Sequence, residues 1–285
     1  MKTRKMLSLA ILFSVLALVA MHAPHARAET VNCTPIDHLP YTISAQGVYC
    51  FTQNLATSMT SGEAITINTN NVVIDLNGFK LGGLGAGAGT QASGIYAYQR
   101  QNITIRNGTV RGFLHGIFLE DNYPYTTSQG HLIEDLRADL NTFMGIYTQG
   151  SGNIIRNCQV VKTGGTTRHS FAVGIEALGP GSRIINNDVS ETVETSSSYG
   201  IVIDDADGAV VERNRVGNAA LGSDTSRGIE VAYSSRVIVN DNSISIMDTG
   251  IFYLVSTGLY SNNRASGCTT AFSGGTPAGT TNYHD

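Results

Sequence analysis

The chain has 285 residues, among them 32 Gly and no Trp, and its formal net charge is −4. Its length suits a single domain with a sizeable core, and a composition rich in Gly, Asn, Ser and Thr disfavours a helical bundle. The acidic balance argues against nucleic acid as a partner, because phosphate contacts need a basic face.

The first 28 residues have the pattern of a signal peptide. A cationic start precedes an apolar run over residues 7–20, and Ala26 and Ala28 occupy the positions that a signal peptidase inspects. The run is shorter than the ~20 apolar residues that a membrane anchor needs. We therefore expect cleavage after Ala28, no membrane insertion, and a secreted or periplasmic mature protein. Cleavage removes four cationic side chains, so the formal net charge changes from −4 to −8.

Residues 29–62 contain two of the four cysteines. Cys33 and Cys50 bracket a short loop, and export makes a disulfide between them permissible. Closing this loop would contribute about 3 kcal/mol to stability in the chain-entropy model. We expect the segment to cap the N-terminal end of the repeats that follow. Cys158 and Cys268 are expected to be unpaired.

From residue 63 to residue 266 a short unit recurs. It begins with Gly-Ile at Gly94, Gly116, Gly145, Gly174, Gly200, Gly228 and Gly250, at intervals of 22 to 29 residues. A second apolar pair follows, and then a turn that contains Asn, at Asn107, Asn157, Asn187, Asn214, Asn242 and Asn263. We expect these Asn residues to adopt the left-handed backbone region and to bond neighbouring amides, and Gly to prevent a side-chain clash at each restart.

A repeat of this length predicts supersecondary units that stack, because one unit cannot bury its apolar face alone. Strand alternation would place the seven isoleucines of the Gly-Ile pairs in one internal column, and the residue after each on the outer face. No window of 11 residues outside residues 1–28 has a sustained helical periodicity. Head-to-tail copies also disfavour the hairpins of a β-sandwich.

Over about residues 64–266 these features resemble the right-handed parallel β-helix repeat family of the pectate-lyase-like superfamily. The resemblance implies an all-β fold, a single-stranded right-handed parallel β-helix solenoid of about eight rungs. It leaves the activity open, because that superfamily contains lyases, hydrolases, epimerases and non-catalytic proteins. Residues 267–285, rich in Gly and Thr, are expected to form a C-terminal cap or tail.

Aromatic residues lie at one end of the outer face of the first strand of the unit. Tyr96, Phe118 and Tyr147 follow successive Gly-Ile pairs, and Tyr98 and Glu120 lie two residues further along their strands. Rungs of a β-helix are about 4.8 Å apart, so these rings could form a ladder that binds the flat faces of sugars. The alternative is cross-strand packing without a ligand.

Acidic residues follow in the middle of the same face. Glu176, Asp204 and Glu230 lie where long inserts precede the Gly-Ile pairs, and one insert supplies Arg168 and His169. Two rungs separate Glu176 from Glu230, about 9.6 Å, and a diagonal of roughly 8 Å separates Glu176 from Asp204. Both values are near the carboxyl separation of inverting glycosidases.

Two kinds of polysaccharide chemistry are compatible with these acids. In a hydrolase, Glu176 or Glu230 would be the general acid and Asp204 the base. In a lyase, the carboxylates would bind Ca²⁺, and Arg168, His169 or Lys162 would abstract a proton. Surface acids also keep a solenoid soluble without any chemistry.

The sequence therefore predicts a monomeric exported protein that binds polysaccharide along its first strand face, and it leaves open whether the protein also cleaves the polysaccharide as a lyase or a hydrolase. Ca²⁺ is the one cofactor that this chemistry suggests, and no metal ligands are assigned. The alternative is a non-catalytic surface or matrix protein, in which the solenoid is a structural or adhesive rod.

Overall fold

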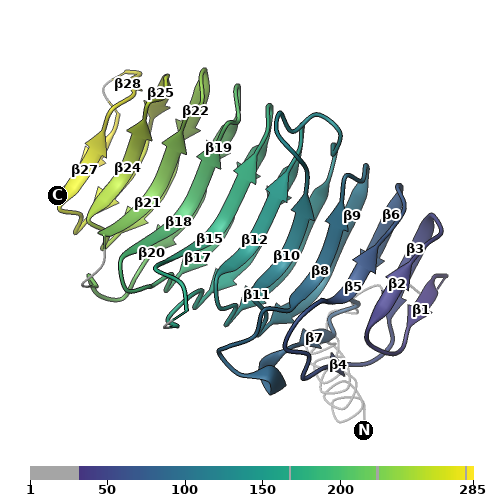
Figure 1. Cartoon of the computed structure of the whole chain (residues 1–285). Coiled ribbons are helices and arrows are strands. Elements are labelled where there is room, and N and C mark those ends of the chain that lie inside the picture. The colour runs from purple at the N-terminus through teal and green to yellow at the C-terminus, as the bar shows by residue number, and fades with distance from the viewer. Residues whose placement is uncertain (1–31, 167, 223–224, 280) are drawn as a thin grey trace, which may run out of the picture. The chain divides into compact units, whose positions relative to one another are not determined.

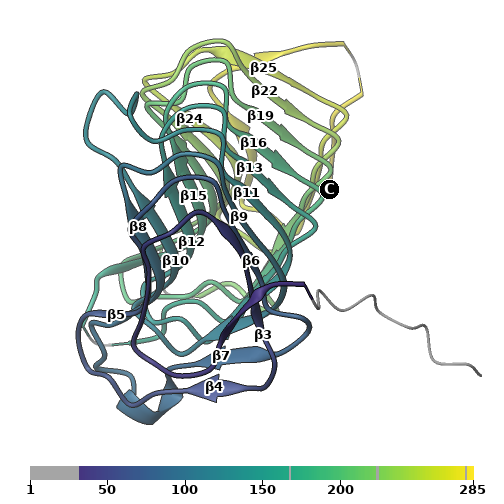
Figure 2. The same ribbon diagram turned by 90° about the vertical axis from the view of Figure 1, so that its right-hand side faces the viewer.

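The structure, a computed structural model, describes residues 32–166, 168–222, 225–279 and 281–285. The predicted signal peptide, residues 1–28, lies outside the described residues. Residues 32–285 form one compact unit in which the chain winds through stacked coils of parallel strands (Figures 1 and 2). No helix in the described part of the chain has the length and hydropathy of a membrane span.

The first strands of successive coils form a ten-stranded parallel sheet. Its strands are β2 (Tyr41–Ile43), β5 (Glu63–Ile67), β8 (Ser93–Tyr98), β10 (His115–Glu120), β12 (Met144–Gln149), β15 (Phe171–Leu178), β18 (Ser197–Asp204), β21 (Thr225–Ala232), β24 (Thr249–Leu254) and β27 (Thr270–Ser273). The predicted number of rungs was about eight. The additional strands β2 and β27 lie in the segments expected as caps, residues 29–62 and 267–285, where no Gly-Ile pair marks them.

The remaining strands form two further columns that share the long strands β9 (Ile103–Arg111) and β11 (Leu132–Asp139) and so make one sheet of 19 strands. One column contains β1 (Thr34–Ile36), β3 (Gly47–Phe51), β6 (Val72–Asp75), β13 (Ile154–Arg156), β16 (Arg183–Ile185), β19 (Val210–Glu212), β22 (Val237–Asn240), β25 (Gly258–Ser261) and β28 (Thr276–Pro277). The other contains β4 (Leu55–Ala56), β7 (Lys80–Gly82), β14 (Gln159–Val161), β17 (Asp188–Ser190), β20 (Arg215–Gly217), β23 (Ser243–Ser245), β26 (Arg264–Ser266) and β29 (Tyr283–His284). A short 3₁₀ turn, η1 (Leu84–Ala86), follows β7.

The isoleucines of the Gly-Ile pairs form one internal column, as predicted. Their register pairs Ile95, Ile117, Ile146, Ile175, Ile201, Ile229 and Ile251 in order. Each of these side chains is at most 1% exposed. Burial of this column removes apolar surface from water along the whole stack, which is the main term that stabilises such a fold.

The glycine of each Gly-Ile pair is required by close packing and not by backbone conformation. None of the seven has a positive φ. A Cβ on Gly145 would lie 2.5 Å from Val160 Cγ1 and 2.6 Å from the carbonyl oxygen of Gly174. The residue before this glycine, Met144, packs with Val173 on the outer face, outside the main core. The side chains of the residues that precede Gly therefore form a second column on the outer face, beside the column of residues that follow Ile.

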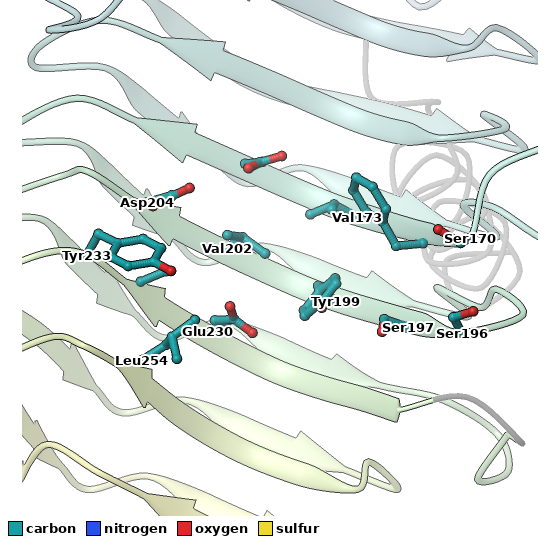
Figure 3. Close-up of a pocket in the computed structure, with 13 residues that line it drawn as sticks. Ser170, Val173, Ser196, Ser197, Tyr199, Val202, Asp204, Glu230, Tyr233 and Leu254 are labelled. Carbon is teal, nitrogen blue, oxygen red and sulfur yellow. The ribbon is translucent and has the colours of Figure 1, made fainter.

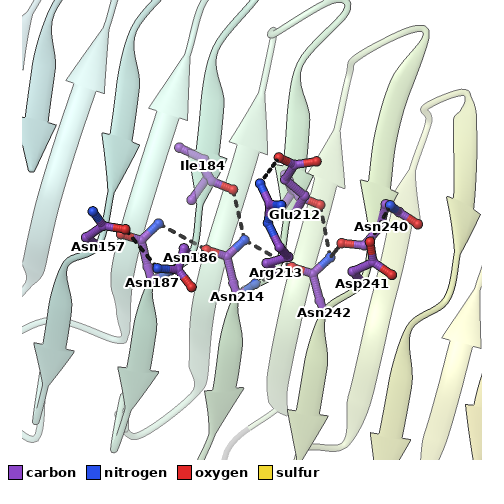
Figure 4. Close-up of polar contacts among 11 residues, drawn as sticks. Asn157, Ile184, Asn186, Asn187, Glu212, Arg213, Asn214, Asn240, Asp241 and Asn242 are labelled. Atoms are coloured by element: carbon purple, nitrogen blue, oxygen red, sulfur yellow. Dashed lines mark hydrogen bonds and ion pairs between the residues drawn. The ribbon is translucent and has the colours of Figure 1, made fainter.

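The turn asparagines have two different roles. Asn107 and Asn157 adopt the predicted left-handed conformation, with φ of 58° and 55°. The other four do not have a positive φ: Asn187, Asn214, Asn242 and Asn263. Those four are buried and bonded to one another across coils, and Figure 4 shows the row from Asn187 through Asn214 to Asn242. Asn187 donates its backbone N–H to Asn214 Oδ1 at 2.9 Å, and Asn214 donates to Asn242 Oδ1 at 2.9 Å. The left-handed residue is the one before each, such as Asn186 with φ of 55°.

The cysteines are paired as predicted. Cys33 and Cys50 form a disulfide with a Cα–Cα distance of 5.8 Å, at the point where β1 pairs with β3. Cys158 and Cys268 are both free.

Candidate functional site

A hollow of about 300 Å³ opens on the outer face of the ten-stranded sheet, over β15, β18 and β21 (Figure 3). It is lined by Ser170, Phe171, Val173, Glu176, Ser196, Ser197, Tyr199, Val202, Asp204, Glu230, Ala232, Tyr233 and Leu254. Figure 3 shows Asp204 of β18 and Glu230 of β21 on this face, with Tyr233 directly after β21 beside them. The inserts before two of the strands contribute serines to its wall. All three acids predicted from the sequence therefore lie in one hollow.

The strand register fixes the relation between these acids. Glu176 pairs with Val202, which pairs with Glu230, so Glu176 and Glu230 lie two rungs apart. Asp204 pairs with Leu178, two residues beyond Glu176 on the same strand. With a rung spacing of about 4.8 Å, the Cα atoms of Glu176 and Asp204 are separated by roughly 8 Å, as the sequence predicted.

Glu176 is the most perturbed carboxyl of the hollow. Burial, and then the neighbouring charges of Asp204 and Glu230, raise its pKa to about 8. Its Oε2 atom is shielded from solvent and has no hydrogen-bond partner in the protein. A carboxyl in this environment keeps its proton at neutral pH, so it can act as a proton donor.

Asp204 differs from Glu176 in both burial and charge. Burial and the adjacent charge of Asp205 raise its pKa to about 6. Its Oδ1 atom also lacks a partner in the protein. Near neutral pH the two groups therefore have opposite protonation states, with Glu176 neutral and Asp204 ionised. This is the arrangement that a general acid and a general base require.

Arg227 contacts an acid of the hollow without lining the hollow itself, and the sequence did not identify it. Its Nη1 forms an ion pair with Glu230 Oε2, and its guanidinium lies 4.1 Å from the centre of the Phe252 ring. Arg227 directly precedes Gly228, in register with Tyr199 of the previous coil. Recognition that the position before each Gly faces outward would have identified it.

The aromatic strip is continuous with the acids. The rings of Tyr96 and Phe118 have centroids 5.5 Å apart, and those of Phe118 and Tyr147 are stacked at 4.8 Å with an interplanar angle of 6°. Tyr147 pairs with Glu176 on the next coil. The rings therefore stack from coil to coil, which both the sugar-binding ladder and the alternative of cross-strand packing predict, and the stack ends beside the hollow. His115 adds a ring 4.8 Å from Phe118.

The two other strip residues are held by hydrogen bonds. Tyr98 OH accepts a bond of 2.6 Å from Asn122 Nδ2, and Glu120 accepts the hydroxyl of Tyr96. Tyr98 is 38% exposed as a residue.

Arg168 and His169 are not brought to the acids. Arg168 Nη1 donates to the carbonyl oxygen of Gly89 at 2.5 Å, and His169 stacks on Phe143 with ring centroids 4.3 Å apart. Neither residue lines the hollow. Arg168 and His169 turn toward earlier coils of the solenoid, although Ser170 of the same insert lines the hollow, so the two residues extend the aromatic surface and do not supply a base to the acids.

The three acids do not fit a Ca²⁺ site. Ca²⁺ takes six to eight oxygen ligands, several of them from side chains that converge on one point. Across the described ranges, no three His, Cys, Asp or Glu side chains are placed to hold a metal ion. Glu176 and Glu230 lie two rungs apart, and Glu230 is already paired with Arg227.

The protein is thus a parallel β-solenoid. Its outer face carries an aromatic strip and a hollow lined by carboxyls. Residues 93–270 match the family described as "Right handed beta helix region", which is more than half of the chain. The chain belongs to this family of right-handed β-helix proteins. No curated protein matches the sequence.

Several solved structures have the same fold. The enzymatically active domain of tailspike protein 2 from bacteriophage CBA120 is 16% identical with a TM-score of 0.59, over 82% of this chain and 38% of that one. The Dettilon tailspike protein is 15% identical with a TM-score of 0.58, over 83% and 56%. Pectate lyase Pel9A is 13% identical with a TM-score of 0.52, over 84% and 72%. At these identities the likeness shows the fold, and this chain spans only 38% and 56% of the two tailspike chains.

Proposed function

We propose that this protein binds a polysaccharide along the aromatic strip and hydrolyses a glycosidic bond over the hollow. The observation that carries the proposal is the pair of carboxyls with opposite protonation states, Glu176 with a pKa of about 8 and Asp204 with a pKa of about 6, beside a stacked aromatic ladder. Perturbed carboxyls in a hollow are typical of catalytic sites. The shared fold with a pectate lyase and with an enzymatically active tailspike domain also supports it.

In the proposed reaction, Glu176 donates its proton to the glycosidic oxygen as the bond from that oxygen to the anomeric carbon breaks. Asp204 accepts a proton from a water molecule, whose oxygen bonds to the anomeric carbon. The Cα atoms of the two residues are roughly 8 Å apart by the rung spacing, and a carboxyl separation of the same order would leave room for this water, as in inverting glycosidases. Hydrolysis is favoured over the Ca²⁺-dependent lyase, because the acids do not fit a Ca²⁺ site.

The charge of the hollow favours an uncharged sugar. Glu176, Asp204 and Glu230 line it, and the cation of Arg227 is already paired with Glu230. Near neutral pH Glu176 is protonated and Glu230 is paired, so a uronate or sulfated sugar would meet the charge of Asp204, and no described Lys or Arg lines the hollow to compensate for it. We also propose, from residues 1–28, that the protein acts after export, in the periplasm or outside the cell.

The test is a panel of neutral and uronate polysaccharides, with binding measured by calorimetry and cleavage by release of reducing ends. Glu176→Gln and Asp204→Asn should lower turnover by about 10²-fold or more and leave binding largely intact. Tyr147→Ala should weaken binding instead. The matched control is Glu212→Gln, an acid on β19 outside the hollow.

The pH profile of the wild type is a second readout of the same experiment. Turnover should fall below about pH 6 as Asp204 gains a proton, and above about pH 8 as Glu176 loses one. Ultraviolet-absorbing products would indicate a lyase and refute hydrolysis. Binding without cleavage would leave a polysaccharide-binding protein, and neither activity on folded protein would favour the structural rod.

A further inference from the structure

The loop between β10 and β11 turns one aromatic ring toward the sheet. Of residues 122–127, all are exposed except Tyr125, which is half-buried. Its neighbour Tyr123 is 76% exposed, and the two rings meet edge to face with centroids 5.8 Å apart. Tyr125 adopts φ of 61°, which is uncommon for a bulky side chain. The loop therefore displays Tyr123 to solvent and directs Tyr125 inward.

A buried carboxylate holds both ends of this loop. Asp121 is 3% exposed, and its oxygens accept the backbone N–H groups of Asn122 at 2.9 Å, Thr127 at 3.0 Å and Ser128 at 2.9 Å. Three bonds to one carboxylate close the loop and limit its freedom.

The same loop is bonded to the aromatic strip. Gln149 accepts the backbone N–H of Asp121 at 2.8 Å and donates its side-chain Nε2 to Tyr147 OH at 2.5 Å. At the other side, Asn122 Nδ2 donates to Tyr98 OH. The position of the loop is thus fixed relative to two rings of the strip.

The Tyr125 phenol lies within the electrostatic reach of the acids. Burial raises its pKa, and the charges of Asp205, Asp204 and Glu176 raise it further. The Tyr125 phenol also contributes to the raised pKa of Tyr147, after burial and the charge of Glu176. Gln149, which accepts the N–H of Asp121 at the start of the loop, pairs with Leu178, and Leu178 pairs with Asp204 on the next coil. The loop that carries Tyr125 therefore begins beside the coils of the acids, and the electrostatic contributions to the pKa of Tyr125 agree with this placement.

We propose that Tyr125 is a substrate-binding residue that stacks on the sugar beside the cleaved bond, and that Asp121 and Gln149 are its positioning residues. The sugar would lie between the ring of Tyr125 from the loop and the ring of Tyr147 from the sheet. An uncharged hexose fits such a site, because its apolar ring face can pack on an aromatic face while its hydroxyls remain free to bond. This inference rests on the proposed polysaccharide-binding function.

The absence of Trp in the chain makes a direct test available. Tyr125→Trp introduces a unique fluorophore, and Tyr283→Trp, at a site 59% exposed on β29, is the matched control. The probes are neutral hexaoses of glucose, galactose, mannose and N-acetylglucosamine, with a uronate hexaose for comparison. A bound hexaose should change the indole emission of the Tyr125→Trp variant and leave that of the Tyr283→Trp variant unchanged.

Affinity measurements give the second arm of the test. Tyr125→Ala should weaken binding of the hexaose about tenfold, the scale of a central interface residue, whereas Tyr125→Phe should keep the affinity within about twofold. Asp121→Asn should raise KM without lowering kcat, because it releases the loop and leaves the acids in place. Added to the Tyr125→Trp variant, the same substitution should shift the indole emission to longer wavelength.

The outcomes separate this inference from the proposed function. A hexaose that binds the wild type, but neither alters the emission of Tyr125→Trp nor discriminates Tyr125→Ala, would overturn the role of Tyr125 and leave the function in place. If no probe binds the wild type by calorimetry, both proposals are overturned. An emission spectrum of Tyr125→Trp that Asp121→Asn leaves unchanged would refute the positioning role of Asp121 alone.

Discussion

Glu176 is held in its protonated form by its place in the hollow and not by a single bonded partner. Burial is the largest cause of its raised pKa, and the charges of Asp204 and Glu230 add to it. Its Oε2 atom lacks a partner, which costs stability in a folded protein. The partnerless Oε2 of this carboxyl is available to a ligand, as the proposed general acid requires.

The raised pKa of Glu176 predicts a dependence of stability on pH. The native carboxyl keeps its proton up to about pH 8, while the unfolded chain loses it near 4.5. The unfolded state thus binds fewer protons in this window, so the free energy of unfolding should fall as pH rises, by up to about 1.4 kcal/mol per pH unit. Below the window both states are protonated, and this stabilisation is fully present.

Urea unfolding between pH 5 and pH 9 measures this effect. Glu176→Gln should flatten the decline in the free energy of unfolding between pH 6 and pH 8. Glu212→Gln, on β19 of the 19-stranded sheet, should not. Parallel curves for wild type and Glu176→Gln would show that the carboxyl ionises normally, and the assignment of Glu176 as the general acid would fail with it.

The sequence was sufficient to predict some residues of the site and not others, for a physical reason. Glu176, Asp204 and Glu230 follow Gly-Ile in the register of the repeat, so alternation alone places them outward. Arg227 directly precedes Gly228. Gly228 and Ile229 both face the core, so simple alternation counted back from Ile229 does not place Arg227 on the outer face. Tyr125 lies in a loop, whose direction depends on the buried carboxylate of Asp121 and has no periodic signal in the sequence.

At the level of the repeated element, the sequence identified the recurring Gly and Asn positions, but it predicted the structural role of only some of the Asn residues. The spacing predicted the buried isoleucine column, because a column depends on period alone. It could not separate a left-handed turn residue from a buried amide one position later, such as Asn186 from Asn187. Both positions favour Asn, the first for its backbone and the second for its paired donor and acceptor.

The packing role of the restart glycine can be tested with two alanine variants. Gly145→Ala would place a Cβ 2.5 Å from Val160 Cγ1 and 2.6 Å from a backbone oxygen, so a shift of the backbone is required. We expect a loss of about 1–3 kcal/mol, the usual cost of overpacking. Gly82→Ala is the control, because the nearest atom would be 3.7 Å away and the residue also lies in a strand.

Gly82→Ala should change the free energy of unfolding little, since it adds a side chain at ordinary contact distance and restricts the unfolded chain. The measurement is urea unfolding of both variants with the wild type. Equal effects at the two sites would show that the restart glycine is not required by close packing.

For the described solenoid as a whole, residues 32–285, stability depends on neighbouring coils and on how the ends are covered. Each coil contacts mainly the coils before and after it, so an end coil has only one neighbour to stabilise it. At the N-terminal end, the disulfide between Cys33 and Cys50 joins β1 to β3. We expect it to stabilise this first described coil, whose strands pair with only one other described coil.

Loss of this disulfide should destabilise the whole chain more than its position at one end suggests. The cysteines are 17 residues apart, so the chain-entropy model gives about 3 kcal/mol for the Cys33→Ser/Cys50→Ser variant. Cys268→Ser, at a free and half-buried cysteine, is the matched control and should change the free energy of unfolding little. Urea unfolding under oxidising conditions, with light scattering for association through the freed edge, measures both effects. If the double variant unfolds at the same urea concentration as the wild type and remains monomeric, the N-terminal coil does not contribute to the stability of the solenoid, and its role as a cap is refuted.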